Sequence, residues 1–180
     1  MVDGTISKIE FINAKGLRFI IGATSDDLLR YPYSSQDRTG APTLMFIEED
    51  DQLLLRLHVK YANRAIAGYS GRNRNTFILN DRLVVKLPRN ADGCMDNEWE
   101  GCISNSTESI GDPLFVQYPR TRLAYVEGIP VVFMERISHM RTADIVRHFG
   151  AEPDWVNSVD GGQVGVNRFG RLVAYDYGVR

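Results

Sequence analysis

The residues best suited to chemistry lie near the end of the chain, where an acidic residue follows an apolar segment. Residues 172–175 have the β-branched and aromatic content of a short strand, and Asp176 and Gly178 come directly after it. A carboxylate at the point where a strand gives way to a glycine-bearing turn commonly holds Mg²⁺ against a phosphate group. The alternative is a surface hairpin in which Asp176 and Gly178 only form a turn, because Asp-x-Gly is frequent in turns.

A lysine in the middle of the chain is the second candidate. Lys86 follows the apolar residues 83–85, so we expect it at the end of a buried strand. A buried ammonium group needs an anionic partner or a route to solvent. Glu98 and Glu100 follow Lys86 in the chain, on a segment that the sequence predicts to be a helix.

Hairpins are the elements expected to position these residues. The hairpins predicted from alternating apolar residues and turn signals pair 5–12 with 17–23, 43–48 with 52–59, 76–79 with 82–87, 118–126 with 129–135, and 164–166 with 172–175. The helices expected begin at a cap of Ser25 or Asp26, at a cap of Asp96 or Asn97 running towards residue 103, and at Thr142 with Gly150 as the stop. We expect residues 68–75 and 88–96 to be loops, since they are polar and contain glycine or proline.

Composition narrows the class of protein. Of the 180 residues 43% are hydrophobic and 24% charged, which is ordinary for a soluble globular protein. A net charge of −2 gives no indication of nucleic-acid binding, and no apolar segment is long enough to cross a membrane. The first residues are not those of a signal peptide, and Cys94 and Cys102 are expected to be reduced thiols in a cytoplasm. We expect the three histidines at the surface or as caps: His58, His139 and His148.

The order of these features resembles the protein-kinase-like superfamily, in particular its aminoglycoside and choline phosphotransferase branch. The order is a glycine-bearing loop, a hairpin ending in Lys86, a helix with glutamates, a hairpin ending in Glu135, and Asp-Tyr-Gly at residues 176–178. Residues 163–178 also have the general look of short kinase-like proteins found in bacteriophage genomes. The resemblance implies ATP and Mg²⁺ as cofactors.

The resemblance also implies roles for residues around a nucleotide. Gly68 and Gly71 would lie in the phosphate loop, and Lys86 would reach the phosphates. Met134 and Glu135 would belong to the hinge that touches adenine.

The ion pair and the metal site follow from the same resemblance. Glu98 would hold Lys86 in an ion pair, with Glu100 as the alternative. Asp176 would bind the metal, with Tyr177 standing where the family has Phe. The family's second metal ligand, an Asn, stands thirteen residues before that Asp, where this chain has Gln163, whose carbonyl oxygen can also coordinate a cation.

Two departures from the family pattern concern the catalytic base and the second lobe. The family's catalytic Asp stands five residues before the metal-binding Asn, and this chain has Ser158 there. Asp160 takes the catalytic role if the loop is rebuilt, and otherwise the base is missing. Residues 138–157 have room for one short helix, and the chain reaches Arg180 two residues after the Asp-Tyr-Gly motif, so we expect no helical substrate-binding lobe.

These observations predict an α+β fold, with a mostly antiparallel sheet resembling a kinase small lobe and a few short helices. Residues 1–60 are expected to form a β-rich N-terminal extension and residues 61–180 the small-lobe domain. The predicted function is that of a degenerate kinase-like protein that binds a host or phage protein in a bacterial cytoplasm. The alternatives are a Mg²⁺- and ATP-dependent phosphotransferase and a structural phage component.

Overall fold

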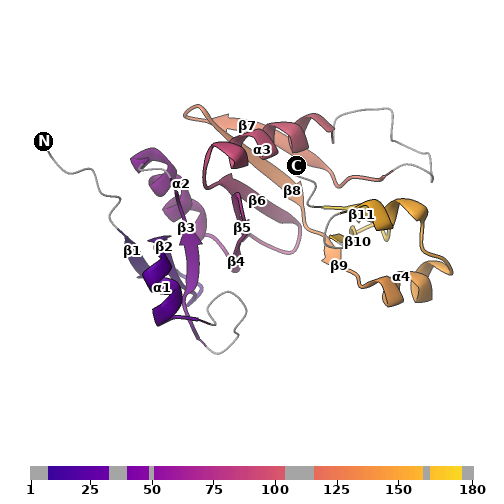
Figure 1. Cartoon of the computed structure of the whole chain (residues 1–180), viewed down its shortest axis with the longest axis horizontal. Coiled ribbons are helices and arrows are strands. Elements are labelled where there is room, and N and C mark those ends of the chain that lie inside the picture. Colours follow the sequence, from indigo (N-terminus) through magenta and orange to yellow (C-terminus); the bar gives the residue numbers. More distant parts are fainter. Residues whose placement is uncertain (1–7, 33–39, 49–50, 104–115, 160–162, 176–180) are drawn as a thin grey trace, which may run out of the picture.

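The computed structural model describes residues 8–32, 40–48, 51–103, 116–159 and 163–175. Within them the fold is α+β, as predicted, and its strands pair mostly antiparallel in three sheets. Figure 1 shows three groups of elements along the chain: an N-terminal sheet with two helices, a central sheet covered by one helix, and a small C-terminal sheet beside another helix.

The N-terminal sheet contains three strands. In the chain, one helix stands between its second and third strands and another follows the third strand. Its strands are β1 (Ile9–Ile12), β2 (Arg18–Ala23) and β3 (Thr43–Phe46), with β1 antiparallel and β3 parallel to β2. The predicted β1–β2 hairpin is confirmed, and Gly16 supplies the left-handed residue of its turn. Helix α1 (Ser25–Arg30) begins earlier than predicted, since the cap is Thr24 rather than Ser25 or Asp26, and the Thr24 backbone N–H donates to the Asp27 carboxylate at 2.7 Å.

The prediction of a strand over residues 52–59 is wrong, because this segment belongs to helix α2 (Gln52–Ala62). Asp51, expected in a hairpin turn, caps the helix by accepting hydrogen bonds from the backbone of Leu53 and Leu54 at 2.8 and 3.2 Å. The buried residues recur at helical spacing and include Leu54, Leu55, Leu57, His58, Tyr61 and Ala62. The four leucines in residues 53–57 fit the period of a strand and that of a helix equally well, and the cap at Asp51 favours the helix.

The central sheet has five antiparallel strands in the order β4-β5-β6-β8-β7. They are β4 (Ala67–Ser70), β5 (Arg74–Ile78), β6 (Leu83–Pro88), β7 (Thr121–Val126) and β8 (Ile129–Glu135). The two predicted hairpins in this region, β5–β6 and β7–β8, are confirmed. The predicted loop over residues 68–75 is wrong, since only residues 71–73 form a turn, between β4 and β5.

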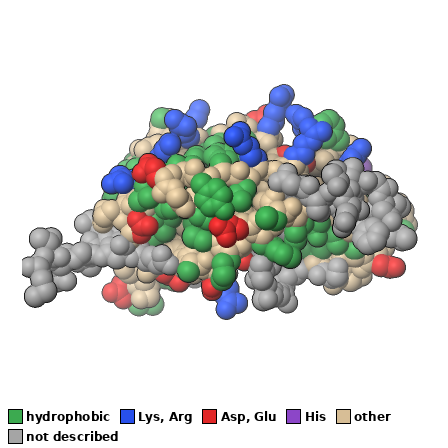
Figure 2. Space-filling view, turned by 90° about the horizontal axis from the view of Figure 1, so that it is seen from above, with side chains coloured by type: hydrophobic (Ala, Val, Ile, Leu, Met, Phe, Trp, Pro, Cys, Tyr) green, Lys and Arg blue, Asp and Glu red, His purple; other side chains and the backbone are tan. Residues whose placement is uncertain are grey.

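Helix α3 (Ala91–Ile103) lies across the central sheet and packs on β6, β7 and β8. It begins before the predicted caps: the Asn90 side chain accepts a hydrogen bond from the backbone of Gly93 at 2.9 Å. Its buried stripe is small or polar and consists of Gly93, Asp96, Asn97, Glu100 and Gly101. Met95 and Trp99 are 56% and 48% exposed on the opposite side. Figure 2 looks onto this region from above and shows hydrophobic side chains across the middle of the surface.

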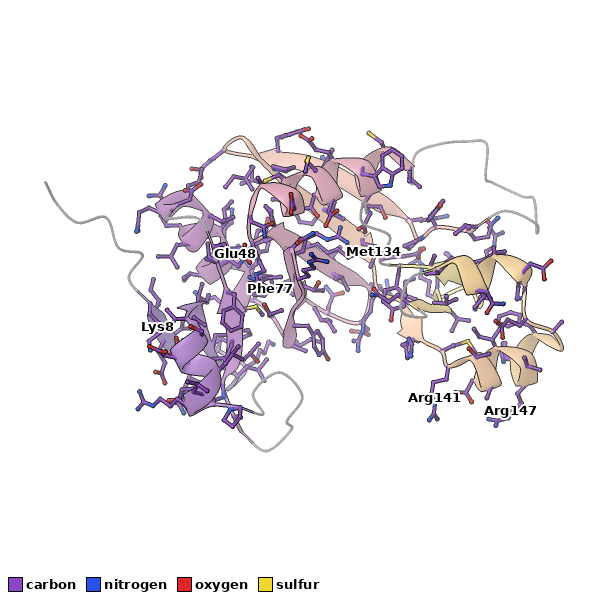
Figure 3. All side chains as sticks on the ribbon, viewed as in Figure 1. Lys8, Glu48, Phe77, Met134, Arg141 and Arg147 are labelled. Atoms are coloured by element: carbon purple, nitrogen blue, oxygen red, sulfur yellow. The ribbon has the colours of Figure 1, made fainter. Side chains whose placement is uncertain are left out.

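The main hydrophobic core lies on the face of the central sheet opposite α3. It joins Phe77, Val85 and Val131 of the central sheet to residues of β2, β3 and α2, with Phe19 among them, so it includes residues on both sides of position 60. Phe77, labelled in Figure 3, lies between the N-terminal elements and the central sheet. The ring of Phe133 meets that of Tyr61 edge to face, with centroids 6.1 Å apart.

The C-terminal elements form a second, smaller core. They are β9 (Ser138–His139), α4 (Thr142–Phe149), a 3₁₀ helix (Asp154–Ser158), β10 (Val164–Val166) and β11 (Leu172–Ala174). The predicted β10–β11 hairpin and the short helix ended by Gly150, which adopts the left-handed conformation, are confirmed, whereas the 3₁₀ helix was not predicted. The cap of α4 is Arg141 rather than Thr142. Ile145 and Trp155 pack on Val164 and Leu172 in a cluster separate from the main core.

Candidate functional site

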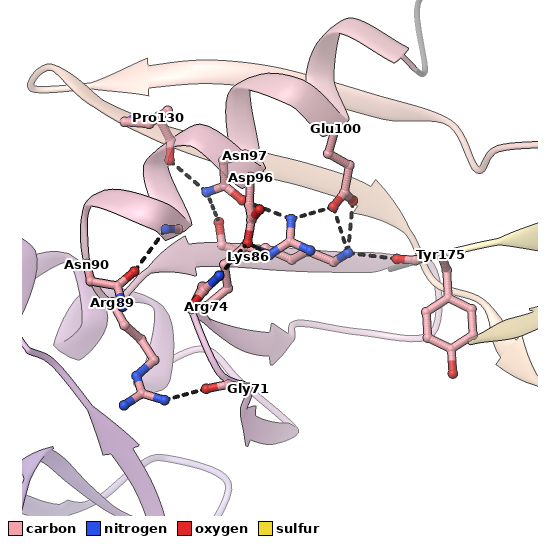
Figure 4. A network of polar contacts seen from close by, with 12 residues as sticks. Gly71, Arg74, Lys86, Arg89, Asn90, Asp96, Asn97, Glu100, Pro130 and Tyr175 are labelled. Carbon is pink, nitrogen blue, oxygen red and sulfur yellow. Dashed lines mark hydrogen bonds and ion pairs between the residues drawn. The ribbon is translucent and has the colours of Figure 1, made fainter. Parts of the chain in front are cut away.

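Lys86 lies at the centre of a buried cluster of charged side chains between β6 and α3 (Figure 4). Because successive strand residues point to opposite faces, its neighbours Val85 and Leu87 enter the main core while Lys86 faces α3. Only 3% of Lys86 is exposed. Its ammonium group donates to both carboxylate oxygens of Glu100, at 2.9 and 3.0 Å, and to the backbone oxygen of Tyr175 at 2.7 Å.

Glu100, not Glu98, is the ion-pair partner of Lys86, so the alternative residue is the right one. Glu98 is exposed and accepts a hydrogen bond from the hydroxyl of Tyr125 at 2.9 Å. That bond raises the pKa of Tyr125, because it favours the protonated phenol. The two glutamates are two positions apart on one helix and therefore point in different directions.

Arg74 adds a second buried cation to the cluster. Its guanidinium group donates to Oε2 of Glu100 at 2.5 Å and approaches the Asp96 carboxylate at 4.0 Å. Arg74 lies on β5 with its side chain on the α3 face, since the residue two positions on, Thr76, pairs with Lys86. The structure buries the Arg74 guanidinium against these carboxylates, with 6% of the residue exposed.

Asn97 ties α3 to the sheet beneath the charged groups. Its side-chain amide donates to the backbone oxygens of Lys86 and Pro130 at 3.2 and 2.8 Å. These bonds run to two different strands, β6 and β8, and so fix the distance of α3 from the sheet and its rotation about its own axis. That rotation directs Glu100 towards Lys86.

The glycine turn between β4 and β5 is held against the start of α3. The Gly71 N–H donates to the Arg74 backbone oxygen at 2.8 Å, and the Arg89 side chain donates to the Gly71 oxygen. The backbone N–H of Arg89 donates to the Asn73 oxygen at 2.8 Å. A Cβ added to Gly93 of α3 would lie 2.1 Å from that same oxygen, so the helix approaches the turn as closely as a glycine allows.

Gly68 serves packing between the two sheets. A Cβ at this position would lie 2.5 Å from Cε of Met45 and 3.0 Å from the ring of Phe19. Gly68 is in strand β4, not in a loop, so the expected phosphate loop is reduced to the turn at residues 71–73. A glycine is required at position 68, but the reason is close contact with the N-terminal sheet rather than a phosphate loop.

The structure brings the end of the described chain to Lys86. The backbone N–H of Tyr175 donates to the oxygen of Gln163 at 3.0 Å, while the Tyr175 oxygen accepts from Lys86. The predicted metal ligand Gln163 therefore lies next to the segment that leads into Asp176. Asp176 itself and the predicted base Asp160 lie outside the described residues. Within those residues, no group of three or more His, Cys, Asp or Glu side chains could hold a metal ion.

The two predicted hinge residues face opposite sides of the sheet. Met134 is buried at 3% exposure and pairs with Val84 of β6, so its side chain lies on the same face as Lys86. Glu135 lies on the other face and lines a pocket of about 520 Å³ at the end of the sheet. Only Met134 is therefore on the lysine side, where the resemblance expects a nucleotide.

His58 lies on the opposite face of the central sheet and is completely buried, so the expectation of a surface or capping histidine is wrong. Its Nε2 accepts a hydrogen bond from the side-chain amide of Asn75 at 2.9 Å, and its Nδ1 donates to the Leu54 oxygen at 2.8 Å. Burial lowers the pKa of His58 from 6.5 to about 4, because the imidazolium form cannot be hydrated there. The same Asn75 donates to the Phe46 backbone oxygen at 2.8 Å and so joins β5 to β3.

The residues whose structural roles sequence reasoning missed are the buried Arg74, Asn75, Asp96 and Asn97 and the half-buried Arg89. Arg74 is two positions from Thr76, which pairs with Lys86, so the strand period indicated that Arg74 and Lys86 share a face. Asp96 and Asn97 are four and three positions before Glu100, so the helical period indicated that they share its buried face. Within the part of the chain that is described, no helix is both long and apolar enough to cross a membrane. No protein-family model and no curated protein sequence matches this chain.

Proposed function

We propose that this chain is a kinase-like small lobe that acts by binding another protein, with its lysine–glutamate pair serving as part of the core. The observation that carries this is the saturation of the Lys86 ammonium group. A lysine has three N–H donors, and the described residues alone place three acceptors around this one: two oxygens of Glu100 and the oxygen of Tyr175. A nucleotide phosphate would have to displace one of them inside a site that is almost fully buried.

The positions of the paired residues support the kinase-like part of the proposal. Counted from β4, Lys86 lies on the third strand of the sheet, and Glu100 lies on the helix that follows. Protein kinases place their lysine on the third strand and its glutamate partner on a helix. The Tyr175 oxygen that meets Lys86 comes immediately before residues 176–178, the Asp-Tyr-Gly motif.

The hydrogen bonding of the glycine turn argues against phosphate transfer. Phosphate-binding loops present free backbone N–H groups to the ligand. In this chain the N–H of Gly71 is bonded within the turn, and Arg89 holds the turn through the Gly71 oxygen. Arg74 is a second cation on Glu100, so this buried carboxylate is paired with two side chains of the chain itself.

A second candidate function, ATP- and Mg²⁺-dependent phosphotransfer, is favoured by one observation. Gln163, Tyr175 and Lys86 come together from three segments, next to the start of the Asp-Tyr-Gly motif. In this alternative Asp176 and Gln163 hold Mg²⁺, Asp160 is the base, and Lys86 turns from Tyr175 to a phosphate.

Titration of the wild-type chain with ATP and Mg²⁺ separates the two candidates. We expect no calorimetric heat of binding and no rise in Tm at millimolar ATP. Specific binding at about 100 times the Kd would stabilise the fold by about 2.7 kcal/mol, which raises the Tm measurably. A rise that Asp176→Asn abolishes, together with ATP turnover, would overturn the proposal in favour of a phosphotransferase.

A positive test for partner binding uses co-purification. The tagged chain, expressed in a bacterial host, is expected to retain one protein at constant stoichiometry through affinity purification and size exclusion. We propose a host or phage protein as the partner, because residues 163–178 resemble short phage kinase-like proteins. Retention of small molecules alone would count against this function.

A further inference from the structure

Four arginines surround the pocket of about 520 Å³ at one end of the central sheet. Arg82 comes from the β5–β6 turn, Arg122 from the start of β7 with Arg120 immediately before that strand, and Arg168 from the β10–β11 turn. All four are exposed. Three separate segments of the chain thus direct guanidinium groups to one opening, whose volume lies in the usual range for ligand sites.

The apolar lining of the pocket comes from both faces at this end of the sheet. Leu83 and Phe133 line it from the face opposite the buried lysine, since both alternate with residues of the α3 face along β6 and β8, and Met134 lines it from the α3 face. Leu83 is three positions from Lys86 on one strand, so the two side chains point to opposite sides. The pocket is distinct from the charged cluster, because Arg74, Lys86 and Glu100 are not among the residues that line it.

The positive charge at this opening is not compensated by neighbouring carboxylates. Among the described residues, no carboxylate forms an ion pair with any of the four guanidinium groups, and Arg120 and Arg168 stack on the Phe169 ring at 5.4 and 4.6 Å. The lining contains one acidic residue, Glu135. Its Oε1 accepts from the Arg120 backbone at 2.9 Å, and its buried Oε2 has no hydrogen-bond donor among the described residues.

Two of these arginines belong to the edge of the sheet. Strand β7 is outermost in the order β4-β5-β6-β8-β7, and within the described residues it pairs with β8 alone. An edge strand presents unpaired backbone N–H and C=O groups that can pair with another extended chain. Arg122 lies on this strand and Arg120 immediately before it.

We propose that the arginine pocket and the β7 edge together bind an extended, acidic segment of a partner protein. Such a segment would pair its backbone with β7 and place alternate side chains over the pocket. Its carboxylates would meet the four guanidinium groups, and an apolar side chain would lie on Leu83 and Phe133. This inference rests on the proposed partner-binding function and specifies the partner's chemistry.

The test measures fluorescence anisotropy of a labelled peptide of about ten residues in which Glu alternates with Leu and Thr. The wild-type chain is expected to bind it, and raising the salt concentration from about 50 to about 300 mM should weaken binding at least tenfold. Arg82→Ala combined with Arg122→Ala should weaken binding by about tenfold or more. The matched control, Arg30→Ala combined with Arg64→Ala, removes the same charge from exposed sites outside the pocket and should change the Kd less than about twofold.

Three further ligands identify what is recognised. A peptide with Gln in place of Glu tests the charge, and a peptide N-methylated at alternate residues tests pairing with β7; both should bind at least about tenfold more weakly. A single-stranded RNA of similar charge should bind more weakly than the acidic peptide. Equal effects of the pocket and control variants, or preference for RNA, would overturn the inference. ATP binding abolished by Asp176→Asn would overturn the proposed function instead, whatever the peptide does.

Discussion

The two faces of the central sheet use opposite chemistry to hold their neighbours. The face under α3 buries Arg74, Lys86 and Glu100, with Asn97 fastening the helix to the strands. The other face buries aliphatic and aromatic side chains of β5, β6 and β8 against the N-terminal elements. His58, a fully buried imidazole on that face, is kept neutral by burial. The same strands supply both faces, residue by residue in alternation.

The comparison teaches that each face is vulnerable in a different way. On the apolar face, the free energy of burial is spread over many contacts, so the loss of one contact removes only a small part of it. On the charged face, each group depends on its partners, because an unpaired charge at that depth is very unfavourable. The charged face therefore specifies where α3 lies more strictly than apolar contacts would.

Removal of the shared carboxylate should give the largest effect. Glu100→Ala leaves two buried cations without the carboxylate that both contact, and we expect a loss of about 3–5 kcal/mol in the free energy of unfolding. Glu98→Ala, on the exposed side of the same helix, should change it by less than about 0.5 kcal/mol. Urea unfolding measures both, and similar values for the two variants would show that the charged cluster does not hold the helix.

Acid titration tests the apolar face. A pKa of His58 lowered from 6.5 to about 4 means that the unfolded chain takes up a proton first, so stability is complete above pH 6.5 and declines as the pH falls towards 4. The difference between the two pKa values corresponds to about 3 kcal/mol. The free energy of unfolding of wild type and His58→Gln should therefore differ in slope between pH 6.5 and 4. Parallel slopes would contradict a neutral, buried histidine.

A smaller effect is expected where α3 meets the glycine turn. Gly93→Ala places a methyl group against the Asn73 backbone oxygen, and we expect a loss of about 1–3 kcal/mol from overpacking, although alanine favours helices. Cys102→Ala, at an exposed position of α3, is the control and should be close to neutral. Thermal unfolding compares the two. A stabilised Gly93→Ala would mean that the turn moves away freely and that its contact with α3 is not fixed.

Much of the strand framework could be predicted because its signals are local. Alternation and turn residues predicted the β1–β2, β5–β6, β7–β8 and β10–β11 hairpins, and Gly150 predicted the end of α4. Residues 52–59 could not be assigned by alternation, since their leucines fit two periods. Helix α3 began too late in the prediction because its buried stripe is polar and its apolar residues are exposed, which reverses the usual amphipathic pattern.

The sequence predicted the residue types of the candidate site, a buried lysine and a glutamate, but not which glutamate pairs with the lysine. A lysine at the end of a buried strand requires an anionic partner, and Lys86 has one. Which glutamate supplies it depends on the rotation of α3, and that rotation depends on Asn97 reaching two strands far away in the sequence. The burial of His58 likewise depends on β5 and β3, which supply Asn75 and Phe46.

By itself the sequence determined the period of the strands, the positions of most turns and the requirement of Lys86 for a counter-charge, because these depend on neighbours within a few residues. The tertiary structure alone decided that Arg74 shares Glu100, that Gly68 meets Met45, and that four arginines open on one pocket. These contacts join segments separated by many residues, and only the packing of the sheets brings them within the few ångströms over which hydrogen bonds and van der Waals contacts act.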